Sequence, residues 1–139
     1  MFEIHGDWKI EVCGNVIVQR FSDGWNEEAI IAYIEDFQAK ATPLIGKEWA
    51  ILSIFEDWEL GVPEIAKHVE EHCTWFLANG CIKDCHVYTT NGTKEMHLER
   101  LLPPTDEYYE RQIFTHAEMA VAWLASCGFV IENSNIMML

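Results

Sequence analysis

The sequence is poor in basic side chains. Nine lysines and arginines stand against 23 aspartates and glutamates in 139 residues, which gives a formal charge of −14 at pH 7. A surface of this sign repels the phosphates of nucleic acids and of anionic lipid headgroups, so we expect no nucleic-acid binding. The charge would favour a basic protein partner, although its simplest consequence is solubility.

Long apolar runs are also missing. No stretch approaches the roughly 20 apolar residues that a membrane-spanning helix requires, so we expect no membrane insertion. The first residues, Met1 to Asp7, show neither the basic region nor the apolar region of a secretory signal peptide. We therefore expect a cytoplasmic protein in which the five cysteines, an odd number, remain thiols.

The motifs of common enzyme classes are missing too. The chain contains no glycine-rich phosphate-binding loop and no nucleophile elbow. Repeats, linkers and low-complexity segments are absent from the sequence, and half of the residues are hydrophobic. These properties are typical of a single domain, residues 1–139, with a substantial core.

The most informative stretch that is present covers residues 48–79. It begins with an apolar run from Trp49 to Phe55, which predicts a strand buried on both faces. The run is followed by a predicted acidic loop of four residues, Glu56, Asp57, Trp58 and Glu59. Pro63 then opens a predicted helix with apolar residues at helical spacing, namely Ile65, Val69, Cys73 and Phe76.

Strands and helices alternate along the rest of the chain. Residues 8–21 predict two short strands around a turn at Gly14-Asn15, closed by residues 22–24. Asn26 is placed as the N-cap of a helix over residues 27–41. Further strands are predicted over residues 82–90 and 111–114, before a final helix.

The final helix carries a clear local signature. Thr115 and Glu118 have the spacing of a capping box, and Phe114 and Met119 bracket it in the positions of a hydrophobic staple. Gly128 is expected to end the helix. Its buried face is expected to contain Ala120, Trp123, Leu124 and Cys127.

Two segments allow alternatives. Residues 93–102 predict either a short helix, favoured by strong helix formers, or a strand of a hairpin that turns at Asn91-Gly92. The tail, residues 130–139, ends in an apolar run from Ile136 to Leu139. It would form an extra strand or contact a second subunit, and from this apolar tail we expect a homodimer.

The order of elements predicts an α/β fold in which a single-layer mixed β-sheet is covered by about four helices. Three stretches resemble the SpoIIAA-like family, whose fold is related to STAS domains such as anti-sigma-factor antagonists. They are the hairpin around Gly14-Asn15-Val16, the strand from Trp49 to Phe55, and residues 111–124. The resemblance spans most of residues 8–127. It implies a SpoIIAA-like, STAS-like fold and a non-catalytic role as a regulatory module that binds a protein partner.

The same resemblance draws attention to the segment after the central strand. In STAS antagonists a serine or threonine at the start of the next helix is phosphorylated to switch partner binding. Here that position falls near Gly61-Val62-Pro63, so the resemblance does not extend to the switch. We take the acidic segment as the candidate binding site: its carboxylates either mimic a charged switch or are merely solvated, and Trp58 either lines a ligand cleft or covers the helix.

Two patterns contain metal-ligand residue types. His68 and His72, with Glu71, form the His-x-x-Glu-His pattern of inverted zinc peptidases, but no third ligand is evident. Cys85 and His86 follow each other on a predicted strand, so they should point to opposite faces of the sheet. We therefore expect no metal, no cofactor and no catalytic residue, and a metal-dependent hydrolase that uses His68 and His72 is the least favoured function.

One further function is an alternative to the regulatory module. A domain of this kind would also serve as a carrier of a small apolar or lipid-like ligand held between the sheet and its helices. A deep apolar pocket would favour the carrier. A filled, convex body with an exposed apolar patch would favour the protein-binding module.

Overall fold

The computed structural model describes residues 3–60, 64–89 and 98–137. Its five strands form one sheet in the order β1-β2-β3-β4-β5, in which β1 is antiparallel to β2 and all other neighbours are parallel. The strands are β1 (Asp7–Cys13), β2 (Val16–Trp25), β3 (Trp49–Leu60), β4 (Cys81–Tyr88) and β5 (Glu110–Phe114). The α/β class and the mixed sheet predicted from the sequence are confirmed.

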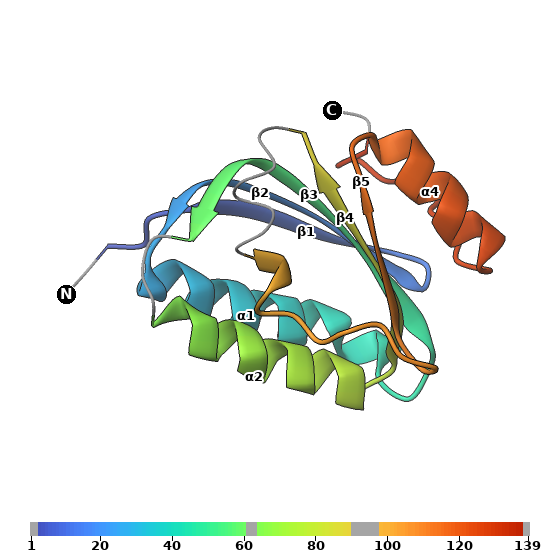
Figure 1. Cartoon of the computed structure of the whole chain (residues 1–139), viewed down its shortest axis with the longest axis horizontal. Coiled ribbons are helices and arrows are strands. Elements are labelled where there is room, and N and C mark those ends of the chain that lie inside the picture. The colour runs from blue at the N-terminus through green and yellow to red at the C-terminus, as the bar shows by residue number, and fades with distance from the viewer. Residues whose placement is uncertain (1–2, 61–63, 90–97, 138–139) are drawn as a thin grey trace.

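Helices lie on both faces of the sheet (Figure 1). The helices α1 (Glu27–Ala41) and α2 (Ile65–Ala78) run side by side across one face, and α4 (Ala117–Ser126) covers the other. The described residues thus contain three α-helices, with a short 3-10 turn at Thr42–Leu44, rather than about four helices. Half of the ambiguous segment 93–102, residues 93–97, lies outside the described residues, and in the described half only Leu98 and Glu99 are helical. In the described part of the chain, no helix is both long and apolar enough to cross a bilayer.

The central strand β3 separates two hydrophobic cores. Ile51 and Phe55 point toward α1 and α2, whereas Leu52 and Ile54 point toward α4. Because both faces are covered, every residue from Trp49 to Phe55 is buried. This confirms the strand that the apolar run predicted.

The predicted acidic loop at residues 56–59 is wrong, because β3 continues through it to Leu60 and pairs with an equally extended β2. The parallel register skips Asp57, which has a φ of 45° and forms a β-bulge. Trp58 therefore points to the same face as Phe55, and their ring centroids lie 5.0 Å apart. The predicted closure at residues 22–24 is wrong for the same reason. The acidic residues after Phe55 predicted the end of the strand, but the bulge lets β3 continue and keeps the indole of Trp58 in the core.

The start of α4 also differs from the prediction. The N-cap residue is His116, which makes no capping hydrogen bond through its side chain, so the capping box at Thr115 does not form. Phe114 is paired with Val87 of β4, and its ring packs on Trp123 rather than on Met119. The predicted staple is therefore wrong, and Met119 is exposed. Because Phe114 belongs to strand β5, its position is set by pairing with β4 and not by the first turn of α4.

The remaining predictions for α4 are partly confirmed. Ala120 and Leu124 are fully buried, whereas Trp123 and Cys127 are only half-buried. Gly128 has a φ of 93°, and its amide donates to the carbonyl of Ala125. The next amide, that of Phe129, donates to the carbonyl of Leu124 at 2.8 Å. These two bonds form a Schellman motif, so the helix ends at the predicted glycine.

The tail packs against its own sheet. Ile136 is buried in the core beneath α4, and the backbone amide of Asn135 donates to the Glu11 carboxylate on β1. Residues 130–137 form no strand, so the expected extra strand is wrong within this range. Since Ile136 is not exposed, it no longer supports the expected homodimer.

Shortening one tail side chain tests this packing. Ile136→Ala is expected to lower the free energy of unfolding by about 2 to 4 kcal/mol, because it leaves a void in the core. The matched change Val130→Ala, at an exposed position of the same segment, should cost no more than about 0.5 kcal/mol. Denaturant titration of both variants measures the difference. Equal losses would mean that the tail does not contribute to the core.

Candidate functional site

The four residues predicted as a binding site do not form one surface. Trp58 is buried at 7% exposure in the core beneath α1 and α2. Glu56 lies instead beside Arg20, with 2.9 Å between its Oε1 and the arginine Nε. Asp57 is exposed at the bulge, and Glu59 is placed by its backbone pairing with Gly24. Among the described side chains of this segment, those of residues 56–58, only Trp58 reaches an interior space.

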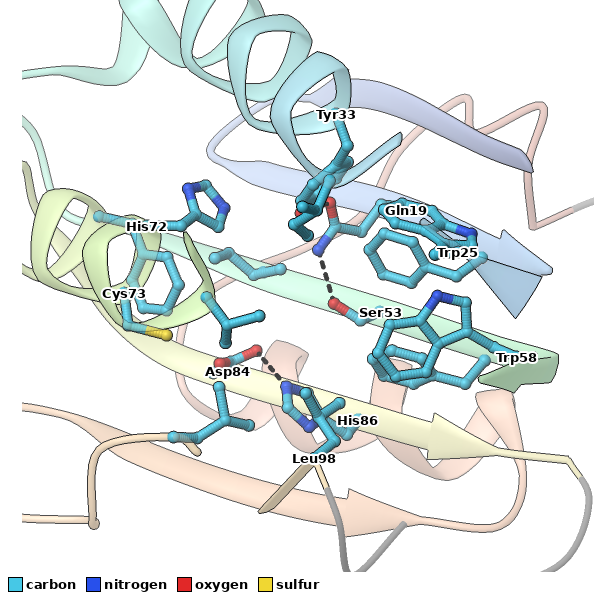
Figure 2. Close-up of a pocket in the computed structure, with 17 residues that line it drawn as sticks. Gln19, Trp25, Tyr33, Ser53, Trp58, His72, Cys73, Asp84, His86 and Leu98 are labelled. Carbon is cyan, nitrogen blue, oxygen red and sulfur yellow. Dashed lines mark hydrogen bonds and ion pairs between the residues drawn. The ribbon is translucent and has the colours of Figure 1, made fainter. Parts of the chain in front are cut away.

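That space is a partly open cavity of about 70 Å³ between the sheet and helices α1 and α2. One end is aromatic, with Phe21, Trp25, Phe55 and Trp58 packed ring to ring at centroid distances of 5.0–6.0 Å. The helices contribute Tyr33 from α1 and, from α2, Val69, His72, Cys73 and Phe76. Figure 2 shows these side chains converging from the sheet and from both helices. Leu98 and Leu102 complete the wall.

The floor of the cavity is polar. Gln19, Ser53 and His86 occupy matched positions on β2, β3 and β4, so their side chains form a row across the sheet. The Tyr33 hydroxyl donates to Gln19 Oε1 at 2.7 Å, and Gln19 Nε2 donates to Ser53 Oγ at 2.7 Å. Asp84 lies two residues before His86 and therefore faces the same side. A polar row under two helices is unusual in a fold core and marks this face as the candidate site.

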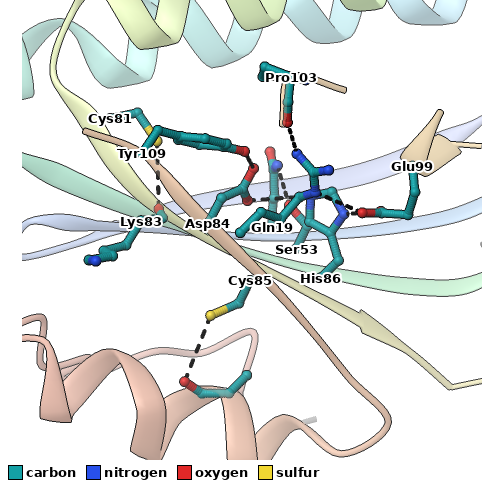
Figure 3. A network of polar contacts seen from close by, with 12 residues as sticks. Gln19, Ser53, Cys81, Lys83, Asp84, Cys85, His86, Glu99, Pro103 and Tyr109 are labelled. Atoms are coloured by element: carbon teal, nitrogen blue, oxygen red, sulfur yellow. Dashed lines mark hydrogen bonds and ion pairs between the residues drawn. The ribbon is translucent and has the colours of Figure 1, made fainter. Parts of the chain in front are cut away.

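A buried charge cluster extends the row toward β5 (Figure 3). His86 lies between two carboxylates, with Nδ1 2.7 Å from Glu99 Oε2 and Nε2 3.4 Å from Asp84 Oδ1. Arg111 donates from Nε to Glu99 Oε1 at 2.7 Å and from Nη1 to the carbonyl of Pro103. Tyr109 donates to Asp84 Oδ2 at 2.6 Å. Two carboxylates thus meet two cationic side chains.

The cluster fixes the charge of its members. Burial alone would lower the pKa of His86, but the neighbouring carboxylates Asp84 and Glu99 outweigh it and raise the pKa to about 9. Burial would raise the pKa of Glu99, yet hydrogen bonding and charge from His86 with help from Tyr88 and Arg111 lower it to about 2. At neutral pH His86 is therefore an imidazolium and Glu99 a carboxylate.

His72 has the opposite character. Its ring is 7% exposed and stands edge-on to Phe37, Tyr33 and Phe76, at centroid distances of 4.5, 5.5 and 5.4 Å. Burial lowers its pKa to about 4, and the more distant charge of Asp84 opposes this only in part. His72 is consequently neutral at physiological pH.

The two histidines of the zinc-peptidase pattern have separate environments. His68 lies at the junction of the helices, with Nε2 3.1 Å from Glu27 Oε2 of α1, whereas His72 lines the cavity. Among the residues that the structure describes, no group of three or more histidine, cysteine or acidic side chains is placed to hold a metal ion. The third ligand that a metal-dependent hydrolase requires is therefore not found in this part of the chain.

All five cysteines are free thiols, and four of them are buried. Cys85 faces α4, where its thiol lies 3.9 Å from the carbonyl of Ala120, while His86 faces the cavity. The predicted divergence of these two neighbours is confirmed. Burial raises the pKa of Cys73 to about 12 and raises that of Cys81 and Cys85 as well. Thiols held in the protonated form are poor nucleophiles and poor metal ligands.

No serine of the floor is activated either. Ser53 neighbours His86 in the sheet register, but its oxygen accepts from Gln19. Both ring nitrogens of His86 face carboxylates instead. A nucleophile needs a base within hydrogen-bond reach, and Ser53 has none among the described contacts.

Sequence reasoning missed most of this site. Ser53 was visible as the one polar residue in an apolar run, and the period of two in β4 places Asp84 and His86 on one face. Polar residues at matched positions of buried strands were the usable signal. Glu99 and Arg111 reach the cluster from distant segments, and nothing local in the sequence indicates that. Comparisons with protein-family models and with curated proteins gave no match for this chain.

Proposed function

We propose that this protein is a non-catalytic binding module that holds a small, largely apolar ligand in the cavity beneath α1 and α2. The observation that carries the proposal is the cavity itself, an aromatic-walled space with a polar floor inside the fold. Such pockets, mostly apolar with a few convergent polar groups, are the usual form of a small-molecule site. The carrier, which the sequence left as an alternative, is thus the function that the geometry supports best.

The size of the cavity limits the ligand. Its volume of about 70 Å³ is well below the roughly 150 Å³ of an engineered apolar cavity that binds benzene. The ligand is therefore either small or inserts only one end. A long lipid chain would have to displace Leu98 or Leu102 from the wall. We therefore favour a compact ring or a short apolar group over a lipid.

Binding without catalysis agrees with the chemistry of the cavity wall. The thiol of Cys73 is held protonated, Ser53 has no base beside it, and His86 is already occupied by two carboxylates. Such a site can bind a molecule without reacting with it. We propose no reaction step for it.

A second proposal is the regulatory role implied by the SpoIIAA-like resemblance, in which a protein partner reads the state of the domain in the cytoplasm. Exposed apolar side chains favour it: Ile113 on the edge strand β5 is 42% exposed, and Met119 at the start of α4 is 55% exposed. An edge strand with an exposed apolar residue is a common docking element. A homodimer would use the same elements, now that Ile136 is accounted for within the fold.

Ligand binding is tested by nuclear magnetic resonance with toluene as the probe. Toluene is expected to shift the methyl signals of Val69 and Ile51, which line the cavity. Val69→Phe fills the cavity and should abolish these shifts, whereas Val130→Phe adds the same side chain at an exposed position and should leave them unchanged. Folding of both variants is checked from their amide spectra. Unshifted cavity signals in the unmodified protein, or toluene shifts that survive Val69→Phe, would contradict the proposal.

A further inference from the structure

Buried polar atoms without hydrogen-bond partners gather at the cavity. In the described ranges four buried side chains carry such atoms: Arg20, Trp58, His72 and Asp84. Arg20 lies outside the cavity and is paired in charge with Glu56. Asp84 Oδ1 is likewise paired in charge, with His86 Nε2 at 3.4 Å. The other two, Trp58 and His72, are both more than nine-tenths buried and line the cavity. An unpaired buried polar group costs stability, so two such side chains around one space indicate a molecule that would pair them.

The two side chains offer a defined set of donors and acceptors. Trp58 presents the Nε1–H, which can only donate. Both ring nitrogens of His72 are unpaired, and as a neutral imidazole it offers one donor and one acceptor. Figure 2 shows His72 and Trp58 well apart across the cavity, with Ser53 between them. A complementary molecule must therefore carry both an acceptor and a donor.

The charges around the cavity further restrict the class of ligand. Asp84 is near enough to His72 to oppose the lowering of its pKa, so the two groups act on one end of the cavity. An anion would meet this carboxylate and the protein's charge of −14. A cation would have to leave water for a mostly aromatic space in which His86 already pairs with Asp84. Both signs are disfavoured, and a neutral molecule remains.

We infer that the cavity selects an uncharged planar ring compound that carries both a hydrogen-bond donor and a hydrogen-bond acceptor, as lactam-bearing heteroaromatic rings do. The inference rests on the proposed function, because it names the ligand class of the same site. The ring stacks among the aromatic side chains, Phe55 and Phe76 among them, and its N–H donates to the unprotonated ring nitrogen of His72. Alternatively, its carbonyl accepts from the Nε1–H of Trp58 at the other end of the cavity.

Four probes of similar size separate this class from its competitors. Toluene is apolar, 2-pyridone carries the donor and the acceptor, benzoate is an anion, and benzylamine is a cation. Their dissociation constants are measured from the methyl shifts of Val69 and Ile51. We expect 2-pyridone to bind about tenfold more tightly than toluene, because each buried group that gains a partner contributes favourably. Benzoate and benzylamine should bind more weakly than 2-pyridone.

Substitution of His72 tests the contact itself. His72→Phe keeps a planar ring but removes both nitrogens, so it should abolish the preference for 2-pyridone over toluene. The matched variant His68→Phe, one turn earlier on α2 and outside the cavity, should keep the preference. Trp58→Phe removes a single hydrogen-bond donor, so it should reduce the preference for 2-pyridone only in part.

The outcomes separate the two proposals. If toluene binds but 2-pyridone binds no more tightly, or if either ion binds best, the ligand class is wrong while the cavity remains a binding site. An unchanged preference in His72→Phe also overturns the ligand class. If none of the four probes shifts the cavity signals, the proposed function itself fails.

Discussion

Replacing His86 with leucine is expected to lower the free energy of unfolding by about 3 to 5 kcal/mol. The two side chains are close in size, so the loss comes from charge rather than from volume. The buried Asp84 and the largely buried Glu99, whose side chain is 16% exposed, would lose the imidazolium between them, and an uncompensated buried charge is costly. Urea or guanidinium titration at neutral pH measures the difference.

The same strand offers a matched control. Lys83 of β4 forms an ion pair with Glu110, with 3.0 Å between Nζ and Oε1, but both side chains are a quarter or more exposed. Lys83→Met keeps the apolar stem and should cost no more than about 1 kcal/mol, because water screens an exposed pair. If His86→Leu proved no more damaging than Lys83→Met, the charge cluster would have no structural role.

The substitution His72→Phe is expected to raise stability by about 1 to 3 kcal/mol at neutral pH. It removes two buried ring nitrogens that have no partner and retains the edge-on packing against Phe37 and Phe76. The neighbouring cavity of about 70 Å³ gives room for the slightly larger ring. A residue that weakens the fold where an apolar ring would strengthen it is typical of a site kept for function.

The pH dependence of stability carries a second signature of His72. Its pKa is about 4 in the folded protein and has the ordinary value of 6.5 in the unfolded chain, because burial disfavours the charged form. Between these values the unfolded chain binds more protons, so stability falls as the pH is lowered from 6.5 to about 4. The contribution of one such group is about 1 kcal/mol per pH unit. Below about 4 both states are protonated and this contribution no longer changes.

His86 acts in the opposite direction and in another window. Its folded pKa of about 9 lies above the ordinary 6.5, so its stabilising effect is complete below 6.5 and is lost as the pH rises through 9. The change of stability between pH 4 and 6.5 therefore reflects His72, and the change between pH 6.5 and 9 reflects His86. Between pH 4 and 6.5, the free energy of unfolding of His72→Phe should depend less steeply on pH than that of the unmodified protein. His68→Phe should keep the steeper dependence. Identical slopes in His72→Phe and the unmodified protein would show that His72 is not a buried neutral base.

Capping residues and hydrophobic periodicity correctly predicted several helices and strands. The helix α1 was predicted over residues 27–41 because Asn26 caps it and the apolar stripe fixes its face, and Asn26 Oδ1 does accept from the amide of Ala29. The apolar run of β3 and the spacing on α2 were equally direct, since periodicity reflects the two-sided burial of the strand and the one-sided burial of the helix. Gly128 ended α4 as its conformational freedom allows.

Predictions failed where tertiary contacts override local chemistry. The acidic residues around Trp58 are typical of a loop, yet the bulge at Asp57 extends β3 and buries the indole. Thr115 has the spacing of a cap, but pairing of Phe114 with β4 fixes the chain before the helix starts. The tail was taken as exposed because its apolar composition contrasts with the acidic chain, and its docking site on Glu11 is 124 residues away in sequence.

The candidate site was the least predictable part. Its polar floor comes from three strands, and the charge cluster adds Glu99 and Arg111 from segments that are remote in sequence. A single histidine on an amphipathic helix does not reveal whether it faces a metal, a core or a cavity. The sequence suggested His72 only as half of a metal pattern, whereas its neutral, unpaired ring beside an interior space is a property of the fold.

The most direct test of cavity binding is to locate the bound probe by intermolecular nuclear Overhauser effects in labelled protein with toluene. We expect cross-peaks from the toluene ring to the methyl groups of Val69 and Ile51, on the face covered by α1 and α2. Cross-peaks to Leu124 and Ile136 beneath α4, or none to any buried methyl group, would contradict binding in the cavity.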